Sequence, residues 1–337
     1  MKKRVAINGL GRIGNQVLRH YIHSAPENFE IVAANTSSVE DAAYLLKYDS
    51  VHGRADFEIE TKGNEKLIVD SKEISIVSSH NPLDLPWRDL EIDIVLECTG
   101  HFTEGSAAAG HIHSGAKKVI ISAPGKNIDK TIVLGVNENE YDPFAHHIIS
   151  NASCTTNSLA PVMKVLEKHF GVENAMITTT HAYTSTQMTV DKRSKKRRRG
   201  RAAAVNIIPT TTGAAVATTE VIPALKGKME AMALRVPVPD GAITEVVALL
   251  KRDISVEEVN RVFMAEAQTE LKGILDFTTD EIVSSDILGN LHSCIIDGLS
   301  TSVVGNRLLK VMAWYDNEYG YSKRLVELSD FVARKMR

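Results

Sequence analysis

The sequence predicts an α/β protein in which a doubly wound parallel sheet is followed by an α+β domain with a mostly antiparallel sheet. Three observations support this prediction. Strands and helices alternate through the first 150 residues, longer strands follow, and a glycine-rich turn joins the first strand to the first helix. The chain has 337 residues, which is enough for two domains of ordinary size.

Short apolar strands alternate with helical stretches in the first part of the chain. The expected strands are Val5–Ile7, Glu30–Ala34, Ile92–Leu96 and Lys118–Ile121, and the expected helices are Arg12–His23 and Ser106–Ser114. Strands that are apolar throughout are buried on both faces, and strands connected by helices run parallel.

The second part of the chain groups its strands away from its helices. The expected strands are Met229–Pro237, Ile243–Lys251 and Leu308–Tyr315, and the expected helices are Val256–Leu271 and Arg324–Lys335. No flexible linker marks the change near residue 150, so we expect the domains to pack closely. We place the first domain at 1–152, the second at 153–317 and a C-terminal helix at 318–337.

Composition excludes several classes of protein. A net charge of −3 and 43% hydrophobic residues are ordinary for a globular chain, and no apolar run is long enough to span a membrane. Three cysteines are too few for a disulfide framework, and a strand begins at once after the N-terminus, so we expect a cytoplasmic protein. No Cys or His spacing resembles a zinc site, and we predict no metal.

A glycine-rich turn follows the first strand. Gly9, Gly11 and Gly14 fit the pattern G-x-G-x-x-G, and a helix follows them. In that position the first glycine allows a tight turn, the second lets a pyrophosphate approach the backbone, and the third lets the helix pack on the strand. The pattern predicts a Rossmann-like dinucleotide-binding domain, with the phosphates at the helix N-terminus.

The end of the second strand bears on the choice between NAD and NADP. An acidic residue there binds the ribose 2′-hydroxyl and repels a 2′-phosphate. This chain has Asn35, Thr36 and Ser37 instead. We therefore expect NADP, or use of both cofactors; the alternative is that Glu40 or Asp41 reaches the ribose.

Cys154 is the candidate nucleophile. It stands where an apolar run over 147–149 gives way to a helical stretch over 159–170. The N–H groups and dipole of a helix start favour a thiolate. Small hydroxyl residues flank the sulfur, which is unusual for a buried apolar cysteine. His181 is the candidate base.

A basic run covers residues 192–201, where eight of ten residues are Lys or Arg. It allows three interpretations: a nucleic-acid-binding patch, a solvated loop, or a site for an anionic small molecule. No aromatic residue interleaves with the run, which disfavours stacking on single strands. Arginine suits phosphate, and Pro209–Ala215 offers hydroxyl and backbone N–H groups that also bind phosphate.

These features together predict one reaction class. A thiolate adds to an aldehyde to form a thiohemiacetal, which loses a hydride to the nicotinamide and becomes a thioester. His181 takes the proton, and a nearby anion site makes phosphate the expected acceptor of the acyl group.

Motifs along the whole chain add a resemblance. They are Asn8–Gly14, Glu97–Gly100, Ser122–Pro124, Ser150–Asn157, His181–Thr184, Arg201–Ala204, Ile207–Ala215, Leu234–Pro237 and Trp314–Tyr321. With these motifs the chain resembles the phosphorylating glyceraldehyde-3-phosphate dehydrogenases from end to end. The resemblance implies glyceraldehyde 3-phosphate and inorganic phosphate as substrates, a homotetramer, and a last helix that returns to the nucleotide domain.

The resemblance also implies residue roles. Cys154 would be the nucleophile and His181 the base. The residues expected to bind phosphate are Thr184, Thr186 and Arg235 for the substrate's C3 phosphate, Ser153, Thr155, Thr212 and Gly213 for the attacking phosphate, and Arg199 between them. The residues expected to bind the cofactor are Asn8, Gly9, Gly11, Arg12, Ile13, Gly14, Asn35, Thr36, Ser37, Thr99, Ser122, Lys192, Arg193 and Asn317, the last at the nicotinamide carboxamide.

The chain departs from the family pattern at three places. Thr36 replaces an Asp of NAD-specific members, and Lys192-Arg193 replaces a Leu-Pro pair. Both changes favour a 2′-phosphate, so NADP preference or dual use is implied. Ser158 replaces a second cysteine that the reaction does not need.

Two other functions remain open. An erythrose-4-phosphate dehydrogenase uses the same scaffold without phosphorolysis, but here Arg199 and Thr212-Gly213 are intact. The basic run 192–201 allows nucleic-acid binding as an additional activity.

Overall fold

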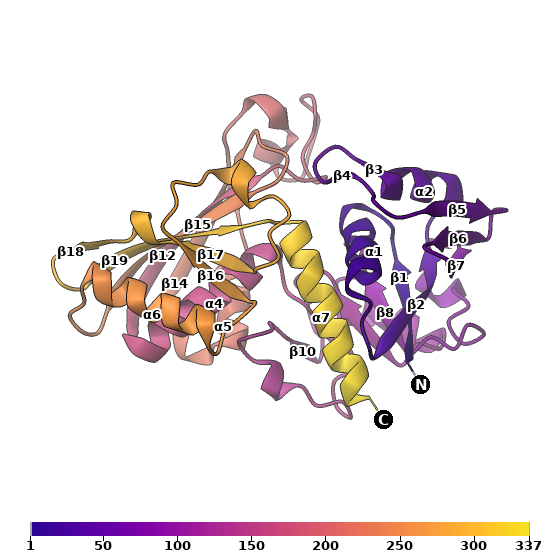
Figure 1. Cartoon of the computed structure of the whole chain (residues 1–337), viewed down its shortest axis with the longest axis horizontal. Coiled ribbons are helices and arrows are strands. Elements are labelled where there is room, and N and C mark those ends of the chain that lie inside the picture. Colours follow the sequence, from indigo (N-terminus) through magenta and orange to yellow (C-terminus); the bar gives the residue numbers. More distant parts are fainter. Residues whose placement is uncertain (1, 337) are drawn as a thin grey trace. The chain divides into compact units, whose positions relative to one another are not determined.

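The computed structural model describes residues 2–336, which divide into two compact units. The first unit contains the chain up to Ile132, Asn139–Ala152 and the segment from Ser322 onward. The second unit contains Val133–Glu138 and Ser153–Tyr321. Figure 1 shows the helices and strands of both units.

The first unit is built on a nine-stranded sheet with the order β10-β11-β9-β8-β1-β2-β7-β6-β5. The strands are β1 (Lys3–Asn8), β2 (Phe29–Asn35), β5 (Ile59–Lys62), β6 (Lys66–Val69), β7 (Lys72–Val77), β8 (Ile94–Glu97), β9 (Lys118–Ile121), β10 (Lys130–Thr131) and β11 (Ile148–Ser150). Every pair from β10 to β7 is parallel, and only β5, β6 and β7 pair antiparallel. The predicted doubly wound parallel sheet is confirmed.

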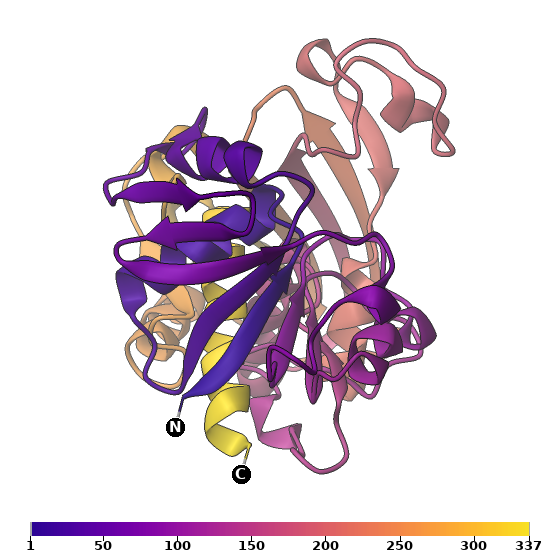
Figure 2. The same ribbon diagram turned by 90° about the vertical axis from the view of Figure 1, so that its right-hand side faces the viewer.

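Helices cover this sheet, and a small hairpin lies beside them. They are α1 (Arg12–Ser24), α2 (Val39–Lys47) and α3 (Gly105–His113), with the hairpin strands β3 (Tyr48–Asp49) and β4 (Gly53–Arg54). The last helix, α7 (Tyr319–Lys335), belongs to this unit from Ser322 onward. Asp330 on α7 accepts hydrogen bonds from the backbone and side-chain amides of Asn28, at 3.0 and 2.8 Å. In both views the yellow α7 lies beside the indigo N-terminal segment (Figures 1 and 2).

The second unit is built on an eight-stranded sheet in which β13-β14-β12-β15-β19-β17-β16 are neighbours and β18 pairs with β19. The strands are β12 (Val172–Ala182), β13 (Ile208–Thr211), β14 (Met229–Val236), β15 (Ala242–Leu250), β16 (Leu275–Thr278), β17 (Cys294–Asp297), β18 (Ser302–Val304) and β19 (Leu308–Tyr315). Only the pairs β12–β14 and β16–β17 are parallel. The prediction of a mostly antiparallel second sheet is confirmed.

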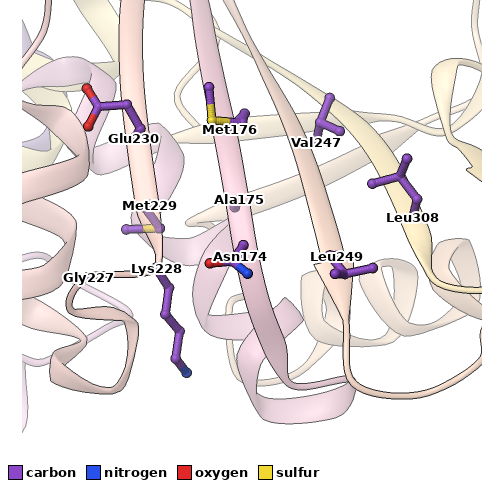
Figure 3. A pocket seen from close by; sticks show the side chains of 10 residues that line it. All are labelled: Asn174, Ala175, Met176, Gly227, Lys228, Met229, Glu230, Val247, Leu249 and Leu308. Atoms are coloured by element: carbon purple, nitrogen blue, oxygen red, sulfur yellow. The ribbon is translucent and has the colours of Figure 1, made fainter.

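Three helices pack on this sheet and form its core: α4 (Cys154–His169), α5 (Ala214–Val221) and α6 (Val256–Gln268). The opposite face carries exposed apolar side chains. Met176 is 65% exposed, and it stands in register with Glu230 on β14 and Val247 on β15. Figure 3 shows these side chains, with Leu249 and Leu308, around a shallow groove of about 390 Å³.

The structure adds elements that the sequence analysis left unassigned. The strands β5 to β7 carry many exposed polar residues, and β12 contains the run Thr178-Thr179-Thr180, so neither region shows the continuous apolar pattern of a buried strand. The helix α4 begins at Cys154 itself, five residues before the expected helical stretch. None of the helices within residues 2–336 is long and apolar enough to cross a membrane.

Candidate active site

Cys154 is the first residue of α4. Ser153 caps the helix, because its Oγ accepts a hydrogen bond from the backbone N–H of Thr156 at 3.0 Å. Ala152 has a φ of 54°, which a residue with a Cβ adopts at an energetic cost. The chain therefore turns sharply from β11 into α4 and presents the sulfur at the helix start.

His181 lies beside the thiol. Its Nε2 is 3.4 Å from Sγ of Cys154, and its Nδ1 is 2.7 Å from the carbonyl oxygen of Ala182. Nη1 of Arg235 is farther from Nδ1, at 3.2 Å, than this carbonyl oxygen is. A carbonyl only accepts, so the shorter contact places the proton on Nδ1, and Nε2 offers its lone pair to the thiol. Desolvation and the charge of Arg235 lower the pKa of His181 to about 3, so the imidazole is neutral near pH 7.

The thiol of Cys154 is harder to ionise than its position at a helix start alone implies. Desolvation raises its pKa, while the positive charge of Arg235 and hydrogen bonds with Thr155 partly lower it. The position of Cys154 at a helix start is visible in the sequence, whereas its desolvation arises only in the folded protein. Forming the thiolate therefore needs a proton acceptor, and Nε2 of His181 is in place for this role.

Two arginines bring positive charge to this region. Arg235 on β14 stands in register with His181 on β12, and its Nη1 donates to the carbonyl of Ala182 at 2.9 Å. Nε and Nη2 of Arg199 donate to Oγ1 of Thr210 and the carbonyl oxygen of Thr211, at 2.9 and 3.2 Å. Desolvation lowers the pKa of Arg235, and the charge of Arg199 lowers it further. Neither arginine pairs with a carboxylate among the described residues, so the region suits an anion.

The predicted hydroxyl residues are arranged in separate groups. Oγ1 of Thr184 and Oγ1 of Thr186 lie 2.9 Å apart, and neither makes a hydrogen bond to Arg235 in the described chain. Oγ1 of Thr212 accepts the N–H of Ala214 at 3.2 Å, and Gly213 precedes α5 with open space beside its Cα.

Tyr315 is a site residue that the sequence analysis did not assign. Its hydroxyl lies 3.0 Å from Oγ1 of Thr155 and 2.8 Å from Oγ1 of Thr179, and its ring packs edge-on against the ring of His181. Desolvation raises its pKa, so the phenol stays protonated. Alternation along β19 predicts only that Tyr315 is buried, and gives no sign that its hydroxyl joins the site.

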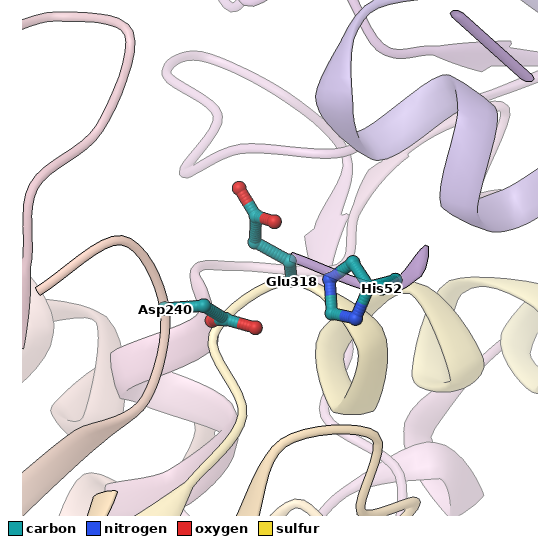
Figure 4. A group of neighbouring side chains, drawn as sticks. All are labelled: His52, Asp240 and Glu318. Carbon is teal, nitrogen blue, oxygen red and sulfur yellow. The ribbon is translucent and has the colours of Figure 1, made fainter. Parts of the chain in front are cut away.

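Three acidic groups gather near the start of α7. The carboxylate of Asp316 accepts the N–H groups of Gly289, Glu318 and Tyr319, at 2.8, 2.9 and 2.6 Å. Desolvation and the charges of Asp316 and Glu318 raise the pKa of Asp240 to about 9. Asp240 is therefore a neutral carboxylic acid near pH 7. Figure 4 shows Asp240 and Glu318, and also His52, which is part of the first unit.

In the first unit, the glycine-rich turn has the shape of a phosphate-binding loop. Gly9 has a φ of 99°, and a Cβ on Gly14 would lie 2.1 Å from the carbonyl oxygen of Gly9. Open space surrounds Gly11, which precedes α1 without a capping side chain, so the first N–H groups of α1 are available to a ligand. Arg12, whose Nη1 is 2.6 Å from the Asp49 carboxylate, begins the helix, and Ile13 is half-buried.

A buried polar network lies behind the predicted cofactor residues. Glu97 accepts hydrogen bonds from Nδ2 of Asn8, the backbone and hydroxyl of Thr99, and Nε2 of His111. Nδ1 of His111 accepts from Nε1 of Trp87 at 2.9 Å, so Nε2 carries the proton. Oδ1 of Asn8 in turn accepts from Nδ2 of Asn35 at 2.6 Å. The network joins the carboxyl ends of β1, β2 and β8, where a dinucleotide binds in this kind of sheet.

The segment after β2 carries the residues expected to choose the cofactor. Thr36 is half-buried and Ser37 is exposed, and neither side chain makes a hydrogen bond within residues 2–336. The hydroxyl of Ser38 caps α2 and lies 3.4 Å from the Glu40 carboxylate. Glu40 and Asp41 therefore stand in the first turn of α2, where the helix dipole favours acidic groups. Ser122 follows β9, and its backbone N–H donates to the carbonyl of Glu97 at 2.9 Å.

The basic run forms a loop whose ends are tied together. Arg201 pairs with Asp191 at 2.7 Å, and the N–H of Lys192 donates to the carbonyl of Gly200 at 2.8 Å. A Cβ on Gly200 would lie 2.2 Å from the carbonyl oxygen of Lys192, so this close approach of the two backbones requires glycine. The side chains without a hydrogen bond or ion pair to any described residue are Lys192, Arg193, Lys195, Arg197 and Arg198, all exposed. Asn317 is 5% exposed, and its side-chain oxygen has no hydrogen-bond partner in the described chain.

Comparison with known proteins accounts for the whole chain. Residues 3–105 match the family described as glyceraldehyde 3-phosphate dehydrogenase, NAD binding domain, and residues 153–317 match its C-terminal domain. The chain is 51% identical to glyceraldehyde-3-phosphate dehydrogenase 2 of Bacillus subtilis, over 100% of this chain and 98% of that protein. It is also 51% identical to glyceraldehyde-3-phosphate dehydrogenase of Geobacillus stearothermophilus, over 99% of each chain. The chain therefore belongs to the glyceraldehyde-3-phosphate dehydrogenase family.

Proposed function

We propose that this protein catalyses the reversible oxidative phosphorylation of D-glyceraldehyde 3-phosphate to 1,3-bisphosphoglycerate with NAD(P). The contact between Sγ of Cys154 and the neutral Nε2 of His181, at 3.4 Å, is the observation that carries this proposal. Arg199 and Arg235 supply positive charge without a carboxylate partner in the described chain, which suits a substrate with phosphate groups.

The first step is proton transfer and addition. Nε2 of His181 takes the proton from Sγ, the thiolate attacks the aldehyde carbon, and the carbonyl oxygen receives that proton to give a thiohemiacetal. A nicotinamide dinucleotide, when bound, supplies the two-electron oxidation that converts the thiohemiacetal to a thioester. His181 then accepts the hydroxyl proton as the new carbonyl forms.

The chain's residues fit this cofactor. The open loop at Gly11 suits a pyrophosphate, and the unpartnered side-chain oxygen of Asn317 suits a carboxamide N–H. Asn8 and Thr99, held by Glu97, would line the binding edge of the first unit's sheet.

The last step releases the acyl group. Inorganic phosphate attacks the thioester carbon and the C–S bond breaks. The product leaves as an acyl phosphate, and Cys154 is released as a thiolate. Ser153, Thr155, Thr212 and Gly213 would hold this phosphate, and Thr184, Thr186 and Arg235 would hold the C3 phosphate. Hydroxyl and backbone N–H groups at helix starts, such as those of α4 and α5, support this assignment.

We propose NADP preference or dual cofactor use. Thr36 and Ser37 carry no charge against a 2′-phosphate, and the exposed side chains of Lys192 and Arg193 have no partner within residues 2–336. Glu40 and Asp41, the alternative partners of the ribose, lie in the first turn of α2, where acidic side chains stabilise the helix. An erythrose-4-phosphate dehydrogenase is the alternative activity; Arg199, bonded to β13, favours the phosphorylating reaction.

Assembly and location are proposed on similar grounds. A homotetramer would cover apolar side chains such as Met176, Met232 and Leu308, which are 65%, 43% and 38% exposed on the second unit. No disulfide joins Cys98, Cys154 or Cys294 in the described chain, which agrees with a reducing compartment such as the cytoplasm. The five exposed, unpaired cations of the basic run would allow nucleic-acid binding as an additional activity, which steep salt dependence of RNA binding would test.

Initial rates test the proposed function directly. The purified protein is assayed with glyceraldehyde 3-phosphate or erythrose 4-phosphate, with NAD or NADP, and with or without inorganic phosphate. We expect turnover of glyceraldehyde 3-phosphate that requires phosphate. Turnover of erythrose 4-phosphate that ignores phosphate would overturn the proposal.

A further inference from the structure

We propose that Lys196 is a third cation of the site formed by Arg199 and β13, and that it binds the inorganic phosphate that attacks the thioester. This inference rests on the proposed function and names one further residue of the same site. Nothing in the basic run itself distinguishes Lys196 from its neighbours, so the assignment comes from where the folded loop places it.

Lys196 and Arg199 reach the same strand. Nζ of Lys196 donates to Oγ1 of Thr211 at 2.7 Å, and Nη2 of Arg199 donates to the carbonyl oxygen of the same residue at 3.2 Å. The next residue along the chain is Thr212, which with Gly213 is assigned to the attacking phosphate. Lys196 therefore stands beside that phosphate site, and its neighbour Lys195 makes no such contact.

Both cations keep donors free for a ligand. An ammonium group has three N–H donors, and the contact with Thr211 uses one of them. Because Oγ1 of Thr211 accepts from Lys196, its own O–H is free to point toward an anion. Arg199 uses Nε and one Nη2 hydrogen in its contacts with β13, which leaves the rest of its guanidinium available.

The cations lie together without a compensating negative charge. No carboxylate among the described residues forms an ion pair with Lys196, Arg199 or Arg235. Desolvation lowers the pKa of Lys196, and the charges of Arg199 and Arg235 lower it further. The three cations are therefore close enough to repel one another. Like charges held together in this way are stabilised when an anion binds among them, and a phosphate dianion is the anion that the reaction requires.

Lys196→Met tests the proposal, with Lys195→Met as the matched control. Both side chains are exposed, so neither change disturbs the core. We expect the KM for inorganic phosphate to rise about tenfold in Lys196→Met, because one charged contact at an exposed site is lost. We expect little change in this KM in Lys195→Met. Saturating phosphate should restore kcat, because the contact serves binding.

A rapid-mixing experiment separates this step from the others. Without phosphate, the wild-type protein and Lys196→Met should give the same burst of reduced cofactor, since thioester formation does not use Lys196. On adding phosphate, the variant should release the acyl group more slowly. A wild-type burst together with an unchanged phosphate KM in Lys196→Met would overturn the role of Lys196. A change confined to the KM of the aldehyde or of NADP would also overturn it, because the bound phosphate would then belong to another molecule. Absence of the wild-type burst would instead refute the proposed function.

Discussion

Arg235 and His181 donate hydrogen bonds to the same acceptor, the carbonyl oxygen of Ala182, at 2.9 and 2.7 Å. The shared carbonyl holds the proton on Nδ1 of His181, so Nε2 faces Cys154 as a lone pair. Desolvation first, and then the charge of Arg235, lower the pKa of His181, and the same charge partly offsets the desolvation that raises the pKa of Cys154. One backbone oxygen thus positions both His181, the candidate base for Cys154, and the guanidinium of Arg235.

Cys154→Ser should abolish oxidation of the aldehyde and leave dinucleotide binding intact. A hydroxyl is a far weaker nucleophile than a thiol in this reaction, so we expect the rate to fall by several orders of magnitude. Turnover is measured by cofactor absorbance, and binding by calorimetry. Cys98→Ser is the control, because desolvation and the adjacent Glu97 raise the pKa of that thiol to about 12 and leave it unreactive. Retained turnover in Cys154→Ser would contradict the assignment of the nucleophile.

His181→Asn should slow thioester formation about 10²- to 10⁴-fold and make it strongly pH-dependent. In the wild-type protein the pKa of His181 is about 3, so the base is neutral at every pH above that value. Without this base the thiol must ionise into solvent, and its raised pKa makes the rate increase with pH. Burst rates from about pH 5 to 9 measure this difference. Parallel profiles for the two proteins would show that His181 does not take the proton.

Thr36→Asp should lower the affinity for NADP relative to NAD by about tenfold or more, because a carboxylate at the end of β2 repels a 2′-phosphate. Thr36→Ser keeps a neutral hydroxyl and is the matched control. The two dissociation constants are measured by fluorescence titration of each variant. If the ratio of the constants does not change, Thr36 has no part in cofactor choice.

Asp240→Asn should make the protein less sensitive to alkaline pH. The native carboxyl keeps its proton up to a pKa of about 9, whereas the unfolded group loses it above 3.8. Between these values the unfolded state binds fewer protons, so native stability falls as pH rises. Asn keeps an oxygen for the N–H of Gly241 and carries no titrating proton. Calorimetry from pH 5 to 9 should show the melting temperature of the variant increasing relative to that of the wild type as pH rises. A difference in melting temperature that does not change with pH would refute the protonated state of Asp240.

Glu97→Gln should destabilise the first unit and weaken dinucleotide binding. Glu97 is fully buried and accepts from four donors, and an amide would turn N–H groups toward some of them. An unsatisfied buried group costs about 1–3 kcal/mol. Glu104→Gln is the control, since the carboxylate of Glu104 pairs with the exposed Asn127. Thermal unfolding and cofactor titration compare the two variants, and equal behaviour would show that the network does not hold the cofactor edge.

Much of the fold follows from local patterns in the sequence. The strands β9 and β19 have the residue bounds that apolar runs predicted, and α1 and α6 differ from their predicted ranges only at one end. The strands β5 to β7 and β12 were not predicted, because exposed polar positions and a threonine run hide their strand character. Such strands are stabilised by pairing with neighbours that are distant in sequence.

The sequence by itself determined the two fold types, the glycine loop, the candidate nucleophile and the candidate base, because each rests on residue type and local spacing. Only the tertiary structure decided which protonation states and partners these groups have. The pKa of Cys154 depends on desolvation and on Arg235, which is distant in sequence. The lowered pKa of His181 depends on desolvation and on the strand register that places Arg235 opposite it. In the sequence the basic run is one block of positive charge, but in the folded chain its side chains have different partners. Lys196 and Arg199 turn to β13, Arg201 ties the loop to Asp191, and the remaining cations face solvent. These differences arise from contacts between residues far apart in the chain, which local sequence patterns do not contain.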